Sequence, residues 1–266
     1  IKENKEYKEI PPNKEEDKKI NFGSSFAEER AMLKAFSKLG YNITKTKGNY
    51  ITLDIKNEHK LYYILGHNKY NEDRRRMSII VRSEANQNNS ILLCKAHDFS
   101  IFNLINKKDQ ETENEINKTI QQIKEMSKYG YRYFIFTKRI LNEEETNNFI
   151  TRYKSAENYV VKSEEHLQKL AVEFEKNLEF MGVLFFEEKI PADLKYNIIK
   201  LNRANIKVWI ASGDKRENVL AVGKNLGIYN ENTIKGDFSD KDKPEDLDIK
   251  MSMLLMQFLF PNEKIN

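Results

Sequence analysis

The sequence predicts an α+β domain built on an antiparallel sheet with flanking helices, followed by part of an α/β domain. Two observations predict this order. Five short β-like segments lie between residues 41 and 96 and are joined by short polar turns, which is typical of an antiparallel sheet. After about residue 179, near-continuous apolar runs alternate with helical segments, which is typical of a parallel sheet covered on both faces.

The predicted first domain covers residues 24–179 and follows a lysine- and glutamate-rich lead-in, residues 1–23, that we expect to be mobile. It begins with a helix over residues 26–40, because apolar residues recur there at helical spacing and Gly40 can end the helix. In chain order we then expect strands in 41–47, 50–56, 60–66, 77–82 and 90–96, a long helix in 111–130, a strand in 132–140 and charged helices in 143–176.

The predicted second domain covers residues 180–266 and represents part of an α/β domain. An apolar strand at its start is followed by a helix that Pro191 can begin. A second apolar strand, IKVWIASG (206–213), is followed by another helix. The last apolar stretch, residues 251–260, is too short to span a bilayer and is expected to pack against the rest of the chain.

Composition narrows the function classes. The net charge of the 266 residues is only +4, from 45 basic and 41 acidic side chains, which argues against a dedicated nucleic-acid binder. The single cysteine, Cys94, excludes an internal disulfide and a multi-cysteine zinc site and is typical of a reducing compartment. No apolar run reaches the roughly 18 residues of a membrane span, so we expect a soluble cytosolic piece.

Four features carry the chemistry, and each has a structural alternative. Three arginines, residues 74–76, precede a predicted strand; at most two of them can face one ligand, and the run can also be a solvent-facing turn. Tyr70 beside them can stack on a base or pack in the core. Lys95 ends a predicted strand, where its ammonium can contact a phosphate or protect a sheet edge. The SGD segment, residues 212–214, follows an apolar strand, where α/β sheets bind ligands, or simply caps a helix.

Six segments in this order resemble the cytosolic part of the P-type ATPases, and within them the lipid-flipping branch. YNEDRRRMSIIVR (70–82) is similar to the family pattern FNS-x-RKRMSVIVR, and IKVWIASGDKRENVLAVGKNLGI (206–228) is similar to IKVW-x-LTGDK-x-ETA-x-x-IG. FAEERAMLKAFSKLGY (26–41) resembles the family's SPDE-like helix, and ILLCKAH (91–97) resembles its KGA strand. GYRYFIFTKRIL (130–141) resembles the GLRTL strand, and LEFMGVLFFEEKI (178–190) resembles the GATAIEDKL segment.

The resemblance implies a nucleotide-binding domain with an antiparallel sheet, inserted into a Rossmann-like (HAD-type) phosphorylation domain to which residues 180–266 would belong. It implies ATP and Mg²⁺ as cofactors and phosphoryl transfer to an aspartate. It also implies that the parent protein is embedded in a membrane and translocates phospholipid, with this chain on the cytosolic side. An accessory subunit is a further candidate partner.

The resemblance also implies a set of ATP-binding residues. Tyr70 takes the place of the adenine-stacking aromatic residue, Lys95 that of the lysine at the pocket floor, and Arg132 that of an arginine reaching the phosphates. At least one guanidinium of the arginine run is expected near phosphate and the others in surface pairs. The remaining residues that the resemblance implies are Glu29, Arg76, Glu188, Ser212, Gly213 and Asp214.

The sequence departs from the family pattern in two ways. The DKTGT and GDGAND motifs are absent from these residues; we expect them before residue 1 and after residue 266, so no catalytic residue or metal ligand is assigned and the chain alone does not complete the reaction. KGA is replaced by Lys95-Ala96-His97, which removes a glycine that allows close backbone approach.

These departures leave two further hypotheses beside the ATP-binding one. The first is an ATPase-like regulatory domain of a larger protein that has lost catalysis, such as a flippase–guanylate cyclase fusion. The second is nucleic-acid binding through the arginine run, which the near-balanced charge and the lack of interleaved aromatic residues disfavour.

Overall fold

A computed structural model of the chain describes residues 27–107, 109–158, 163–187, 189–212, 216–229, 236, 238 and 242–259. Its contacts divide the chain into two compact units. The first unit contains residues 1–123 and 133–186, the second contains residues 124–132 and 187–266, and each is described by itself. The lead-in predicted for residues 1–23 lies outside the described residues.

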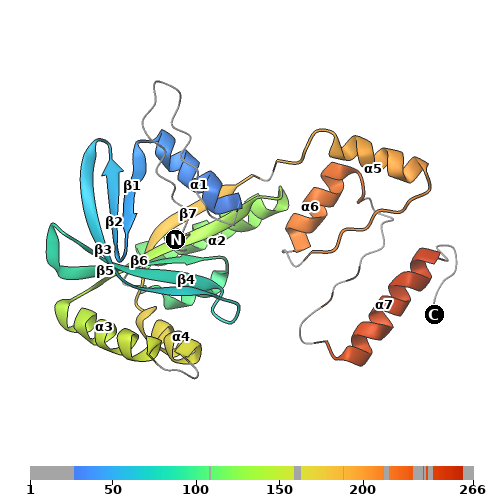
Figure 1. Cartoon of the computed structure of the whole chain (residues 1–266). Coiled ribbons are helices and arrows are strands. Elements are labelled where there is room, and N and C mark those ends of the chain that lie inside the picture. The colour runs from blue at the N-terminus through green and yellow to red at the C-terminus, as the bar shows by residue number, and fades with distance from the viewer. Residues whose placement is uncertain are drawn as a thin grey trace. The chain divides into compact units, whose positions relative to one another are not determined.

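The first unit is built on a seven-stranded sheet whose strands lie side by side in chain order (Figure 1). The neighbouring pairs from β1–β2 to β5–β6 are all antiparallel. The antiparallel sheet with flanking helices predicted from the sequence is therefore confirmed. The strands are Tyr41–Lys47 (β1), Tyr50–Ile55 (β2), Glu58–Asn71 (β3), Arg76–Ser83 (β4), Asn86–Ala96 (β5), Arg132–Leu141 (β6) and Glu179–Phe186 (β7).

Helices flank this sheet. Two of them, α3 and α4, pack against each other and cover β3 to β5, while α1 packs beside β1 (Figure 1). A capping box begins α3, in which the side chains of Asn142 and Glu145 each accept a hydrogen bond from the other's backbone N–H. The helices are Ala27–Lys38 (α1), the 3-10 helix Phe99–Leu104 (η1), Gln110–Lys128 (α2), which continues into the second unit, Glu143–Glu157 (α3) and Ser163–Phe174 (α4).

Alternation along the strands gives the sheet two different faces. The helix face, covered by α3 and α4, carries Ser78 of β4 and Cys94 of β5, which are cross-strand partners. The site face carries Lys95, which follows Cys94 directly, and its cross-strand partner Phe136 of β6. Strand β5 therefore contributes Cys94 to the helix face and the next residue, Lys95, to the site face.

The core of the first unit lies mainly between the sheet and its helices. Close packing is most evident at Gly66 of β3, where an added Cβ atom would lie 2.8 Å from Cε1 of Phe149 on α3. A larger residue fits there only if the ring of Phe149 or the helix that carries it moves. The fully buried side chains of this core include Ile80, Leu92, Ile101, Ile123, Ile135, Leu141, Phe149 and Leu178.

The second unit contains three helices of its own, Leu194–Arg203 (α5), Arg216–Leu226 (α6) and Pro244–Leu259 (α7). The helices α5 and α6 pack against each other and bury Ile198 and Leu226. Gly227, with φ of 75°, ends α6, and the backbone N–H groups of the next two residues donate to the carbonyl oxygen of Gly223. Among the described residues, none of the helices in either unit is long and apolar enough to cross a bilayer.

The predicted parallel sheet is not found in the described part of the second unit. Residues 206–212 contain no strand, and β7, which we expected to pair with them, extends the sheet of the first unit beside β6. A strand needs a neighbour whose backbone supplies hydrogen bonds, and the described residues of the second unit offer none. The strand predicted at 206–213 is therefore wrong for its described part, and the Rossmann-like domain stays a proposal.

Candidate functional site

The side chain of Lys95 lies at the centre of a cluster on the site face. Its Nζ atom is 2.6 Å from Oε1 of Glu29 on α1 and 4.5 Å from the ring centroid of Phe134 on β6. The side chains of Lys95 and Glu29 are only 12% and 16% exposed. Because water screens them little, the ammonium, the carboxylate and the aromatic face interact more strongly than they would at an open surface.

The ring of His97 lies between two other aromatic rings. Its centroid is 5.2 Å from that of Tyr70 and 4.6 Å from that of Phe134, and both contacts are edge-to-face. Phe186 of β7 packs on Phe134 at 4.8 Å, also edge-to-face. We call the pair Tyr70 and Phe134 the aromatic slot, and Glu29, Tyr70, Lys95, His97 and Phe134 the site cluster.

A tight turn between β3 and β4 holds the residues that follow Tyr70. The side chain of Asn71 accepts hydrogen bonds from the backbone N–H groups of Asp73 and Arg74, and the backbone N–H of Arg75 donates to the carbonyl oxygen of Asn71. Arg75 adopts φ of 50°, a left-handed conformation that a turn position requires. The side chain and the carbonyl group of Asn71 therefore hold the turn formed by residues 71–75.

Tyr70 reaches the site cluster because the strand that carries it is irregular. The β3–β4 register shifts between Asn68 and Asn71, which interrupts the alternation of side chains just before the turn. Burial raises the pKa of the Tyr70 phenol, and the nearby Glu72 carboxylate raises it further. At neutral pH Tyr70 therefore presents an uncharged, half-exposed ring.

The helix face holds two of the three arginines in a buried ionic cluster. Nη1 of Arg74 lies 2.6 and 2.8 Å from the two carboxylate oxygens of Glu175, and Nε of Arg76 lies 2.6 Å from one of them. Ser78 donates to the same carboxylate at 2.7 Å. All four side chains are buried. We call Arg74, Arg76, Ser78 and Glu175 the buried cluster.

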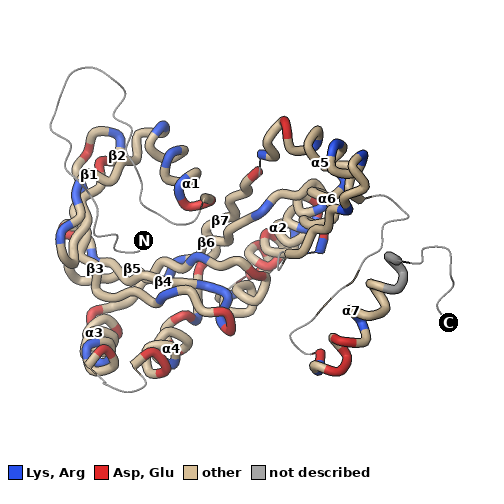
Figure 2. The backbone as a smooth tube through the Cα atoms, turned by 45° about the vertical axis from the view of Figure 1, so that its right-hand side comes forward, with Lys and Arg blue, Asp and Glu red and all other residues tan. Residues whose placement is uncertain are grey.

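The expectation of surface pairs for the arginine run is right for one residue and wrong for another. Arg75 is exposed and pairs with Asp98 at 3.2 Å. Arg74 pairs in the interior instead, because the turn and strand β4 direct it under α4, where Glu175 is fully buried. Figure 2 shows that Lys and Arg are interspersed with Asp and Glu along α3 and α4 themselves.

The structure brings three of the nine predicted ATP-binding residues together, namely Glu29, Tyr70 and Lys95. The guanidinium of Arg76 lies in the buried cluster on the other face. Arg132 begins β6 and falls in the second unit, and Ser212 is an exposed residue of that unit. The other three, Glu188, Gly213 and Asp214, lie outside the described residues.

Two members of the site cluster were missed by the sequence analysis. Phe134 lies in β6 on the same face as Phe136, which is the cross-strand partner of Lys95, so strand pairing could have indicated it. His97 was noted only as a departure from the KGA pattern. Ala96, which stands where the family pattern has glycine, is 1% exposed, and its side chain lies on the helix face.

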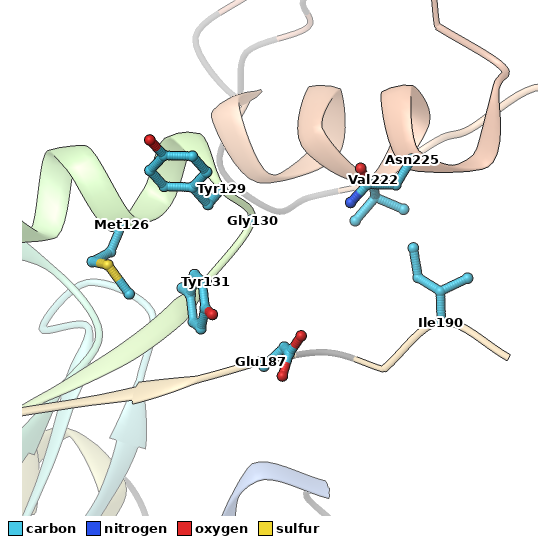
Figure 3. A pocket seen from close by; sticks show the side chains of 8 residues that line it. All are labelled: Met126, Tyr129, Gly130, Tyr131, Glu187, Ile190, Val222 and Asn225. Carbon is cyan, nitrogen blue, oxygen red and sulfur yellow. The ribbon is translucent and has the colours of Figure 1, made fainter. Parts of the chain in front are cut away.

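A separate pocket of about 390 Å³ lies in the second unit (Figure 3). Tyr129, Gly130 and Tyr131 line it near the end of α2, together with Glu187 and Asn225. Of the six predicted ATP-binding residues that the structure describes, none lines this pocket. Among the described residues, no group of three or more histidine, cysteine, aspartate or glutamate side chains is arranged to hold a metal ion.

The site cluster combines features that suit a flat base with a charged tail. It offers an aromatic ring at the surface, an ammonium group at the end of a strand and a carboxylate that can accept a hydrogen bond from an amine.

Comparison with known proteins identifies the family. The family model for the cytoplasmic domain N of P-type ATPases matches residues 5–190. Similar curated proteins are phospholipid-transporting ATPase DNF2 of Saccharomyces cerevisiae (25% identical over 225 residues), probable phospholipid-transporting ATPase 12 of Arabidopsis thaliana (29% over 221) and phospholipid-transporting ATPase IC of Homo sapiens (27% over 224). These alignments cover 80–83% of this chain and 14–18% of each relative. The chain, which spans less than a fifth of the length of these relatives, belongs to the P-type ATPase family and carries its cytoplasmic domain N.

Proposed function

We propose that the first unit binds ATP, together with Mg²⁺, as the nucleotide-binding domain of a phospholipid-transporting P-type ATPase. The observation that carries this proposal is the meeting of Glu29 and Lys95, 66 residues apart in the chain, beside the rings of Tyr70 and Phe134. The family match and the names of the relatives support the same conclusion.

Three residues of the site cluster, Tyr70, Lys95 and Glu29, have a task in this proposal. The exposed face of Tyr70 stacks on the adenine ring. The ammonium of Lys95 attracts the phosphates, and Glu29 accepts a hydrogen bond from the amino group of the base. For both tasks to be carried out, the contact between Lys95 and Glu29 has to lengthen when the nucleotide enters.

The other assigned residues remain part of the proposal. Arg132 would contact the phosphates, and Glu188, Ser212, Gly213 and Asp214 would face the γ-phosphate and ribose when the nucleotide-binding and phosphorylation domains close. Arg76 would contribute directly only if it left Glu175, so we propose that its main contribution is to hold β4 in place.

The parent protein would use the bound nucleotide in a reaction that these residues do not complete. Mg²⁺ bound to ATP neutralises phosphate charge, and the γ-phosphoryl group is the one transferred to an aspartate elsewhere in the parent. We propose that this transfer drives a phospholipid across a membrane, with this chain on the cytosolic face and an accessory subunit as partner.

Binding of a fluorescent ATP analogue to the 266-residue chain, with competition by ATP, tests the proposal. We expect Lys95→Ala to weaken binding about tenfold or more, because the variant loses a charge-assisted contact in a largely desolvated position. The matched control is Lys60→Ala, on β3, whose exposed side chain pairs with Glu58. Absence of binding at millimolar ATP, or equal affinities of the two variants, would contradict the proposal.

A second candidate function is a regulatory domain of a larger protein, such as a flippase–guanylate cyclase fusion, that has lost ATP turnover. The observation in its favour is the position of His97, whose ring fills the aromatic slot. The sequences on both sides of this chain in the parent gene decide between the two. An intact DKTGT motif upstream with no cyclase domain downstream would exclude the regulatory alternative.

A further inference from the structure

We propose that His97 is a self-occluding residue of the nucleotide site. Its imidazole occupies the aromatic slot between Tyr70 and Phe134, where a purine base would stack, and it has to turn out of the slot before a base can enter. The inference rests on the proposed ATP-binding function. It adds that His97 lowers the affinity for ligands that carry a base and leaves the binding of the phosphates unchanged.

The ring geometry is the first argument. Aromatic rings in contact have centroids about 4.5–7 Å apart. The distances from His97 to Tyr70 and to Phe134, 5.2 and 4.6 Å, both fall in this range. The imidazole is therefore in contact with both rings of the slot, and a base that stacks between these rings needs the volume that it fills.

The attachment of His97 to the backbone is the second argument. Its backbone N–H donates to the carbonyl oxygen of Arg75 at 3.1 Å, and the next residue, Asp98, caps η1 by accepting from the backbone N–H of Ser100 at 2.7 Å. Asp98 also pairs with Arg75 at 3.2 Å. The main chain is held on both sides, so the imidazole leaves the slot by rotation about the side-chain torsions of His97.

Partial exposure of His97 is the third argument. The residue is half-buried, unlike its neighbour Ala96, which is buried on the helix face. A side chain that reaches solvent can change rotamer without unfolding the sheet around it. His97 can therefore act as a removable side chain, whereas Ala96 is a fixed part of the core.

Removal of the imidazole should affect ligands according to whether they carry a base. A base entering the wild-type slot has to replace two edge-to-face contacts of His97, and this lowers its net affinity. Tripolyphosphate has no base and contacts only the charged part of the site. ATP and AMP should therefore gain affinity in His97→Ala, while tripolyphosphate should not.

Isothermal titration of the 266-residue chain with ATP, AMP and tripolyphosphate tests this. We expect His97→Ala to bind ATP and AMP about five- to tenfold more tightly than the wild type, with unchanged affinity for tripolyphosphate. The matched control is His59→Ala, at the exposed start of β3, eleven residues before Tyr70 and roughly 35 Å from it along an extended strand. This control should bind all three ligands as the wild type does.

The outcomes separate the inference from the proposed function. Binding of ATP that is equal or weaker in His97→Ala than in the wild type would overturn self-occlusion and leave ATP binding intact. Binding by His97→Ala alone would support self-occlusion in its strongest form. Failure of every variant to bind ATP or AMP would overturn the proposed function and the inference with it.

A measurement on the wild-type chain keeps the inference testable if His97→Ala does not fold. In the free protein, nuclear Overhauser contacts should join the imidazole protons of His97 to the ring protons of Phe134, because the centroids are 4.6 Å apart. Saturation with AMP should abolish these contacts while contacts between AMP and Tyr70 appear. Persistence of the His97–Phe134 contacts in the AMP-bound protein would overturn the proposal.

Discussion

The two faces of one sheet use charge in different ways, although neighbouring residues of the same strands supply both. On the helix face, the carboxylate of Glu175 receives two guanidinium groups and a hydroxyl group, and all of these side chains are buried. On the site face, one ammonium meets one carboxylate beside aromatic rings that are partly exposed. The first arrangement is closed, whereas the second is the one that we propose exchanges its contacts for those of a ligand.

The arginine run shows how strand geometry makes this division. Arg74 and Arg76 are two residues apart and both point under α4, while Arg75 between them is 59% exposed and pairs with Asp98. A concentrated positive charge in a sequence therefore need not indicate a negatively charged partner outside the protein. Here two of the three arginines neutralise an internal carboxylate, and in the proposed function the charge that faces a ligand comes from Lys95 on another strand.

Replacement of Glu175 should have the largest effect on stability. In Glu175→Gln the carboxylate charge is lost, while the guanidinium groups of Arg74 and Arg76 remain buried without an anion. Loss of one partner of a buried ionic cluster typically costs about 3–5 kcal/mol. Urea unfolding followed by far-ultraviolet circular dichroism should show this as a lower midpoint with an unchanged slope.

The matched control is Glu173→Gln, two residues earlier on α4. Glu173 makes a two-pronged pair with Arg152 at 2.7 Å, and both side chains are 44% exposed. Exposed pairs contribute about 0.2–1 kcal/mol, so this variant should unfold almost as the wild type does. Comparable losses in the two variants would show that burial does not distinguish the cluster from the surface.

The free thiol on the helix face should make stability fall at high pH. Burial and, second to it, the nearby Glu175 carboxylate raise the pKa of the Cys94 thiol from 9.0 to about 12. The unfolded chain therefore loses this proton at lower pH than the folded chain does. Stability from this group is complete below about pH 9 and is lost as the pH rises toward 12, by about 2 kcal/mol at pH 10.5.

Unfolding at pH 8 and pH 10.5 in the wild type and in Cys94→Ala isolates this contribution. Other groups, such as Tyr133, whose pKa burial raises to about 12, affect both proteins alike. The stability difference between the proteins should shrink by about 2 kcal/mol between the two pH values. A constant difference, or rapid modification of the folded wild type by a thiol reagent at pH 8, would show that Cys94 is not shielded.

The antiparallel sheet and its helices could be predicted because their signals are local. The segments from Tyr41 to Ala96 alternate and are separated by short polar turns, and each pairs with its neighbour in the chain. The lack of a strand in residues 206–212 could not be predicted in the same way. An apolar run such as IKVWIAS indicates burial, but only a partner strand can make it part of a sheet, and β7 pairs elsewhere.

The site was predicted in part for a related reason. Tyr70, Lys95 and Glu29 were found through their resemblance to a family pattern, and their contacts are long-range. His97 was recognised as a departure, yet its position between two rings depends on strand register, which the sequence does not state. Arg76 matches the pattern equally well, but its buried partner Glu175, directly after α4, lies about a hundred residues further along the chain.

Replacement of Lys95 or Glu29 should have the smallest effect on the free energy of unfolding. These variants also test most directly whether the two faces of the sheet differ. The pair is less buried than the buried cluster, with side chains 12% and 16% exposed, and Lys95 also contacts Phe134. Lys95→Met and Glu29→Gln should each cost about 1 kcal/mol, between the values for exposed and fully buried pairs. The double variant should cost less than the sum of the two, because each single variant leaves its partner unpaired. Urea unfolding of the four proteins measures this coupling directly. Strict additivity would mean that the two side chains stabilise the fold independently. A loss of stability as large as that of Glu175→Gln would mean that the site face is as closed as the helix face. The site face would then have no contact to give up to a nucleotide.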